Sequence, residues 1–231
     1  MKPFLFSLAL LPAVVFGQWE ASVFGGVGLG RLPTDLRPAT GRGESQKVFF
    51  GPGWAAGVAV SHALSKPLRF TTGLHWACIS GRDEYWLQGG FLWSSAERRL
   101  GYAVLPMLLE AEAGRFRLGG GFQLGLLALQ HGRFTYDLRY LPDSYQEFET
   151  NDLGLRRFDI GVAAQASVLI SPRWRVGLRY YRGLSDIKDH SDMYLSPLWT
   201  EQAVLTGAYQ LLPRKRTALR DAAAPDEPSV D

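Results

Sequence analysis

Apolar and polar residues alternate one by one through long parts of this chain. In FDIGVAAQASVLISPRWRVGLRYY, residues 158–181, every second side chain from 158 to 170 is apolar, and the residues between them are small or polar. The alternation resumes after residues 171–173. A period of two is typical of a β-strand, because successive side chains point to opposite faces of a sheet. The stretch therefore predicts a β-hairpin with one apolar face and one polar face.

Eight such stretches occur, and the links between them fall into two length classes. The links at residues 64–67, 113–114 and 171–173 are tight, whereas the others are long and polar. Short links at one end and long links at the other are typical of a barrel that crosses an outer membrane. The sequence thus predicts an all-β fold, an eight-stranded antiparallel up-and-down transmembrane β-barrel, with strands near residues 19–29, 53–63, 68–80, 100–112, 115–128, 155–170, 174–184 and 200–212.

The two rows of side chains along these strands differ in polarity. One row carries large apolar residues such as Leu105, Phe122, Val162 and Leu178. A soluble barrel of the lipocalin type would place this row inside, whereas a membrane barrel places it outside against lipid. The segregated loop lengths and the aromatic residues at strand ends favour the membrane arrangement. The inward row then includes Arg69, Thr71, His75, Tyr102, Gln123, Gln165 and Tyr181.

The N-terminal segment has the features of an export signal. Met1 and Lys2 precede the apolar run PFLFSLALLPAVVFG, which is too short to span a bilayer. Val15 and Gly17 fit a cleavage site after residue 17. The single cysteine, Cys78, has no partner for an intramolecular disulfide. We expect a signal peptide over residues 1–17, a barrel over 18–212, and a disordered periplasmic tail over 213–231, which is rich in charge and proline.

The inward row predicts a charged lumen. Glutamates and arginines of matching parity flank the tight link at residues 113–114, and further arginines follow in a later strand. The interior of an eight-stranded barrel is just wide enough for side chains to fill, and buried charges need partners. We therefore expect a network that plugs the lumen rather than a conducting path. Its members are Glu110, Glu112, Arg115, Arg117, Asp159, Arg175 and Arg179.

Patterns for catalysis and metal binding are weak. Lipid hydrolysis or acyl transfer needs a histidine beside a serine or a carboxylate, and of the four histidines only His75 falls in a strand with an inward direction. Aspartates surround His190, but loop carboxylates are more often solvated or paired with basic neighbours. The glycines of FGGVGLG match a dinucleotide loop only by chance, because no helix follows. We expect no catalytic residue, no metal site and no cofactor.

Two segments resemble a known family. In YAVLPMLLEAEAGRFRLGGGFQLGLL, residues 102–127, a proline in an apolar strand precedes a charged residue, a tight turn and a glycine-rich strand. The segment FDIGVAAQASVLISPRWRVGLRYYRGLSDI, residues 158–187, contains an Arg-Tyr-Tyr-x-Gly-Leu ending. Both are similar to hairpins of the Bacteroidota outer-membrane β-barrel family that includes PorT-like proteins. The resemblance implies an outer-membrane barrel with a role in envelope assembly or secretion.

The functional expectation is a structural or binding role through the outer loops. The expected partners are outer-membrane lipid and lipopolysaccharide, the barrel assembly machinery, and a protein or ligand at the outer loops. Nucleic acid is not expected, because the net charge is only +3 and the basic residues are dispersed. Two alternatives stay open: a lipid-modifying enzyme of the lipid A hydrolase or acyltransferase type, and a small solute channel.

Overall fold

The computed structural model describes residues 19–33, 45–86, 93–137, 145–188 and 198–211. The signal peptide expected over 1–17 and the tail expected over 213–231 lie outside these residues. In the described part of the chain, no helix is long and apolar enough to cross a membrane.

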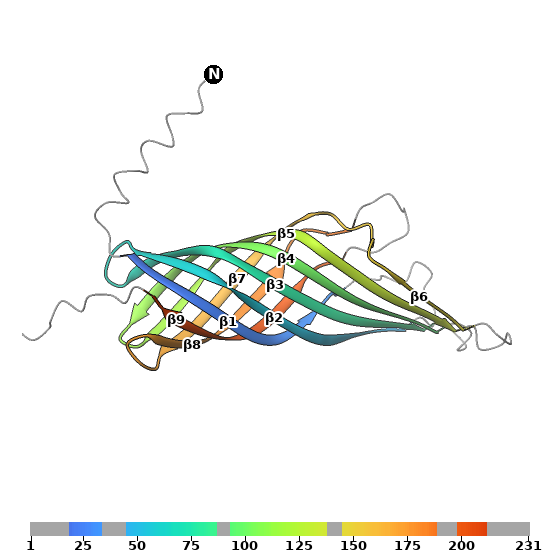
Figure 1. The fold of residues 1–231 in the computed structure, drawn as a ribbon, viewed down its shortest axis with the longest axis horizontal. Coiled ribbons are helices and arrows are strands. Elements are labelled where there is room, and N and C mark those ends of the chain that lie inside the picture. The colour runs from blue at the N-terminus through green and yellow to red at the C-terminus, as the bar shows by residue number, and fades with distance from the viewer. Residues whose placement is uncertain (1–18, 34–44, 87–92, 138–144, 189–197, 212–231) are drawn as a thin grey trace, which may run out of the picture.

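Eight of the nine strands that the structure describes close into a barrel (Figure 1). Each strand of the ring pairs with its neighbours in antiparallel fashion, and the pairings of β1 with β9 and of β4 with β5 make the ring continuous. The predicted eight-stranded antiparallel barrel is therefore confirmed. The strands of the ring are β1 (Trp19–Arg31), β2 (Ser45–Ala63), β3 (Leu68–Trp86), β4 (Trp93–Ala113), β5 (Phe116–Asp137), β7 (Phe158–Leu169), β8 (Trp174–Gly183) and β9 (Glu201–Gln210).

The tight links gather at one end of the barrel, which we call the turn end, and the long links lie at the other, the outer end. Between β4 and β5 only Gly114 and Arg115 form the turn, and Gly114 has a positive φ of 63°. Glycine adopts this left-handed conformation without the steric cost that a Cβ brings. The two length classes of links seen in the sequence therefore correspond to the two ends of the barrel.

Several strands continue past the ring at the outer end (Figure 1). β3 and β4 stay paired as far as Trp86 and Trp93, and the outer part of β5 pairs with an additional short strand, β6 (Gln146–Thr150). The long polar link expected after residue 128 was thus wrong over residues 129–137 and 146–150, which are strand. Phe134 and Phe148 stack across this hairpin with ring centroids 5.0 Å apart, and cross-strand aromatic pairs of this kind stabilise a sheet.

The outer surface of the ring is apolar. Large side chains that a soluble protein would bury are exposed here: Val162 is 38% exposed and Phe122 is 59% exposed. A continuous surface of this kind is unsuited to water and matches the hydrocarbon layer of a bilayer. The outward direction predicted for the apolar row is confirmed for Leu105, Phe122, Val162 and Leu178, and the same surface includes Val27, Val58, Leu74, Leu118, Leu124, Ile160 and Leu205.

The interior of the barrel is divided into an apolar outer half and a charged half at the turn end. In the outer half, Ile187 and Leu198 from the link between β8 and β9 are completely buried. The Ile187 backbone N–H donates to the Leu198 carbonyl at 3.0 Å, and the Trp199 N–H donates to the Pro33 carbonyl at 3.1 Å. This apolar cluster closes the outer mouth, and its other members are Leu32, Ala55, Ala77, Ile79, Leu100, Tyr102, Val104, Leu127 and Val204.

Candidate functional site

A cluster of charged side chains fills the turn end of the lumen. Strand alternation points all of them inward, because the outward positions beside them carry apolar residues. Register brings them to one level: Glu110 of β4 lies opposite Arg69 of β3, and Glu112 lies opposite Arg117 of β5. We call this group the lumen cluster, and it consists of Glu20, Arg69, Glu110, Glu112 and Arg117.

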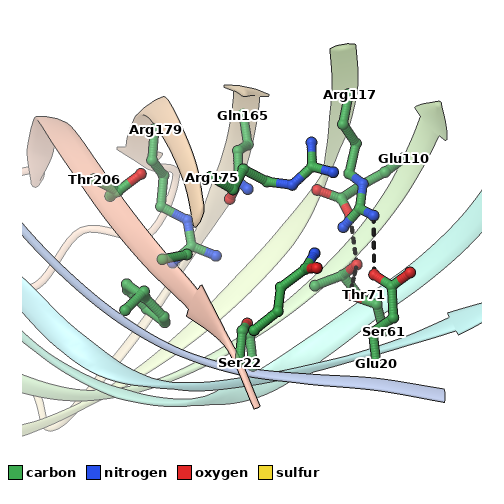
Figure 2. Close-up of a pocket in the computed structure, with 14 residues that line it drawn as sticks. Glu20, Ser22, Ser61, Thr71, Glu110, Arg117, Gln165, Arg175, Arg179 and Thr206 are labelled. Carbon is green, nitrogen blue, oxygen red and sulfur yellow. Dashed lines mark hydrogen bonds and ion pairs between the residues drawn. The ribbon is translucent and has the colours of Figure 1, made fainter. Parts of the chain in front are cut away.

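Glu20 connects the two arginines of the lumen cluster across the barrel. One carboxylate oxygen lies 2.9 Å from Nη2 of Arg69. The other lies 3.1 Å from Nη2 of Arg117 (Figure 2). Arg117 also lies close to two other carboxylates: its Nη2 is 3.0 Å from Oε2 of Glu112, and its Nη1 is 3.6 Å from Oε2 of Glu110. Nη1 of Arg69 is 3.5 Å from Oε2 of Glu112. Two arginines are thus shared among three carboxylates, which is the pairing that buried charges require.

Hydroxyl groups complete the surroundings of Glu110. Its carboxylate accepts a hydrogen bond from Thr71, whose hydroxyl also lies 2.8 Å from that of Ser61 (Figure 2). Gly119 faces Glu110 on the next strand, and a Cβ at that position would lie 2.5 Å from Glu110 Cγ. The glycine therefore leaves the space in which the Glu110 side chain lies.

The structure brings together only part of the predicted network. Arg115 does not enter the lumen; it is exposed in the two-residue turn, where the alternation of the strands has ended. Asp159 lies in the outer half of the lumen, where it accepts hydrogen bonds from Ser185 at 2.8 Å and from Thr200. It therefore holds the link between β8 and β9 against the barrel wall rather than joining the lumen cluster.

Arg175 and Arg179 of β8 line the lumen as predicted, but neither forms an ion pair with a carboxylate within the described ranges. The sequence interpretation missed Glu20, which is the centre of the lumen cluster. Its signal is the alternation Trp19, Glu20, Ala21 at the start of β1, which points the carboxylate inward. Arg69 was placed in the inward row but not in the network.

A second candidate site is a groove on the strands that extend past the ring. Its volume is about 510 Å³, which is within the usual range for sites of small ligands. Three aromatic rings form one wall: Phe148 stacks on Phe134 and also on Tyr136, with centroids 5.9 Å apart in the second pair. We call this site the outer groove; it is lined by Asp83, Tyr85, Ser94, Ser95, Ala96, Arg98, Phe134, Tyr136, Phe148, Thr150, Asp152, Leu153, Leu155, Lys188 and Leu198.

Charged groups of both signs lie among the rings of the outer groove. Arg98 pairs with Asp83 at 2.6 Å, and its guanidinium lies 5.6 Å from the centre of the Phe134 ring. Burial, and then the positive charge of Arg98, lower the pKa of Lys188 from its ordinary value. Outside the groove lining, on the paired strands β5 and β6, the hydrogen bond from Arg133 lowers the pKa of Glu147. The groove therefore combines an aromatic wall with two basic and two acidic side chains, Arg98 and Lys188 beside Asp83 and Asp152, an arrangement suited to ring stacking and to polar groups.

The histidines lie apart from one another. His62 packs on Trp19, His75 packs edge-on against Phe24, and His131 lies 2.9 Å from Asn151. His190 lies outside the described residues. Among the residues that the structure describes, no three histidine, cysteine or acidic side chains gather in a way that could hold a metal ion.

Comparison with known proteins identifies the class of this barrel. The profile of the family described as outer membrane protein beta-barrel domain matches residues 11–189, so the chain belongs to that family. No curated protein matches the sequence. The protein is therefore an outer-membrane β-barrel protein.

Among solved structures, similar folds include Ail, the attachment invasion locus protein of Yersinia pestis, at 11% identity and a TM-score of 0.42 over 84% of this chain and 99% of Ail. Neisserial surface protein A is 10% identical with a TM-score of 0.39, covering 82% of this chain and 96% of that one. The outer membrane protease OmpT from Escherichia coli is 10% identical with a TM-score of 0.36, covering 84% and 97%.

Proposed function

We propose that this outer-membrane protein binds a ligand at the outer groove, and that the barrel serves as its membrane scaffold. The observation that carries the proposal is the groove itself: about 510 Å³ of space, on the side of the long links, above a barrel whose mouth is closed. Binding residues are commonly carried on loops and extensions that a rigid scaffold positions.

The contents of the lumen favour a scaffold over a solute channel. The charged half contains a cavity of only about 50 Å³, and the outer half contains buried apolar side chains such as Ile187, Leu198 and Leu100. A conducting path needs a continuous polar passage. We therefore propose that the barrel does not conduct solutes.

The lining of the outer groove supports a ligand with both a flat apolar face and an anionic group. The rings of Phe134, Tyr136 and Phe148 offer stacking surfaces. Arg98 and Lys188 offer positive charge, and the lining also contains the carboxylates of Asp83 and Asp152. Sugars that carry acidic substituents and peptides with an aromatic residue next to an acidic one share this chemistry. The proposed function is accordingly binding rather than catalysis, with lipid modification as the alternative from another class.

The proposal extends to the pathway, the export and the partners of the barrel. The resemblance to PorT-like proteins of Bacteroidota supports a role in envelope assembly or secretion, and the N-terminal apolar run supports a signal peptide cleaved after residue 17. Lipid and lipopolysaccharide would contact the apolar outer surface, and the barrel assembly machinery would insert the chain.

The groove proposal is tested with the refolded full chain in detergent micelles, applied to an array of glycans and an array of short peptides. We expect Phe148→Ala and Arg98→Gln each to weaken binding of the selected ligand about tenfold, because each removes a ring or charge contact of roughly 1 kcal/mol or more. Tyr145→Ala is the matched control, since Tyr145 is an exposed aromatic residue beside β6 that does not line the groove. Equal binding by the wild type and both groove variants would contradict the proposal.

A further inference from the structure

The lumen carries more positive than negative charge near the turn end. Three glutamates, Glu20, Glu110 and Glu112, face four arginines, Arg69, Arg117, Arg175 and Arg179. The difference is one positive charge, 4 − 3 = 1. The carboxylates are already engaged with Arg69 and Arg117, so this excess falls on the two arginines of β8.

Of these four arginines, Arg179 has the fewest polar partners for its charged guanidinium. It is 7% exposed, and the contact that the structure gives its guanidinium is the ring of Phe24, 5.5 Å from the ring centre. No hydrogen bond or ion pair from Arg179 to another residue occurs in the described part of the chain, and its Nε is buried without a partner. An arginine cannot escape this situation by losing its proton, because its guanidinium stays charged in proteins.

Arg175 lies one step closer to the lumen cluster but is similarly under-bonded. It is 6% exposed, donates a long hydrogen bond of 3.4 Å to Ser167, and has a buried Nε without a partner. Figure 2 shows both arginines pointing into one cavity, Arg175 toward Glu110 and Arg117, and Arg179 away from them. The side of the cavity around Arg179 is therefore its positive side.

Neutral donor groups surround this positive side. The cavity walls include the amide of Gln165, which lies opposite Arg179 on β7, and the hydroxyl of Ser22. The hydroxyl of Thr206 also lines the cavity, but it donates to the Gly177 carbonyl at 3.1 Å. The cavity measures about 50 Å³, whereas a single water needs roughly 10–15 Å³ of such space. It is large enough for a monatomic anion with a water molecule and too small for an organic ligand.

We propose that the lumen binds a small monovalent anion of the chloride class beside Arg179 and Gln165. A water molecule could satisfy hydrogen bonds there but would bring no charge, and a buried charge without a counter-charge costs several kcal/mol. The apolar cluster closes the outer mouth, so the site lies on the turn-end side of that cluster. The site is independent of the outer groove. Its role is to balance the charge in the turn-end half of the lumen, because a further lumen carboxylate, Asp159, accepts hydrogen bonds from Ser185 and Thr200 in the outer half.

The direct test is a crystal structure of the full-length protein grown with sodium bromide, whose anion gives an anomalous signal. We expect a bromide peak within hydrogen-bonding reach of the Arg179 guanidinium. A cavity that contains water alone under these conditions would overturn the proposal.

The second test measures thermal unfolding of the refolded protein in micelles, with chloride replaced by gluconate at constant ionic strength. Above the Kd, each tenfold rise in chloride should raise the Tm by about 3 to 5 °C, because the anion binds the folded state alone. Arg179→Gln should abolish this dependence, and Arg179→Lys should retain part of it. Arg182→Gln is the matched control, because Arg182 is an exposed arginine of the same strand.

A Tm that is the same in gluconate as in chloride would show that chloride has no specific site. A chloride dependence that survives in Arg179→Gln would place the anion elsewhere, and either result would refute the proposal. If Arg179→Gln does not fold, the bromide structure and the comparison of anions on the wild type still decide the question.

Discussion

Replacing Glu20 with alanine should destabilise the barrel by about 3–5 kcal/mol, the usual cost of removing one partner from a buried ion pair. Glu20 pairs with both Arg69 and Arg117, at 2.9 and 3.1 Å. These arginines are 2% and 6% exposed, so the substitution leaves two buried cations with fewer counter-charges. Urea titration in liposomes, followed by the gel mobility that distinguishes folded from unfolded barrels, measures the loss.

Double mutants show whether the loss is specific to the pairs. Arg69→Ala or Arg117→Ala combined with Glu20→Ala should destabilise less than the sum of the two single changes, because the same interaction is removed twice. Glu149→Ala is the control: this carboxylate is exposed on β6 and lies 3.8 Å from Arg133, so its loss should cost less than about 1 kcal/mol. Strict additivity in both cycles would mean that water separates the charges in the lumen.

The strands and their facing could be predicted from the sequence because a period of two is a local property. Val162 and Gln165 lie three residues apart, so they point to opposite sides of the sheet, and a bilayer outside with a narrow lumen inside leaves one consistent assignment. The tight links were visible for the same reason. Local alternation, however, does not show where a strand ends, and Arg115 was placed inside although the turn begins at Gly114.

Contacts across the barrel could not be predicted from alternation. Glu20 and Arg117 are 97 positions apart, and their pairing depends on how far the strands are staggered when the ring closes. The outer hairpin of β5 and β6 could not be predicted because its sequence is mostly polar. Its stacked aromatic rings are the feature that indicates a sheet. Likewise, nothing local in the link between β8 and β9 shows that Ile187 and Leu198 fold into the barrel mouth.

A charged side chain on the lipid-facing surface is least favourable at the middle of the bilayer. We therefore expect Val162→Arg to lower the free energy of unfolding by about 2–4 kcal/mol. Val162 pairs with Phe122 near the middle of the contact between β5 and β7, and both side chains face outward. An arginine there must either enter hydrocarbon or thin the bilayer around it.

Depth is what distinguishes this effect from a general penalty for arginine. Leu184 is also apolar and exposed, but it follows the end of β8 at the outer end of the barrel, where the side chain reaches the interface and the expected cost is about 0–1 kcal/mol. Urea titration of Val162→Arg and Leu184→Arg in liposomes compares the two positions directly. Equal losses of unfolding free energy at both positions would contradict a membrane centred on the ring. In a hydrocarbon layer, the loss caused by an added charge depends on its position along the barrel axis.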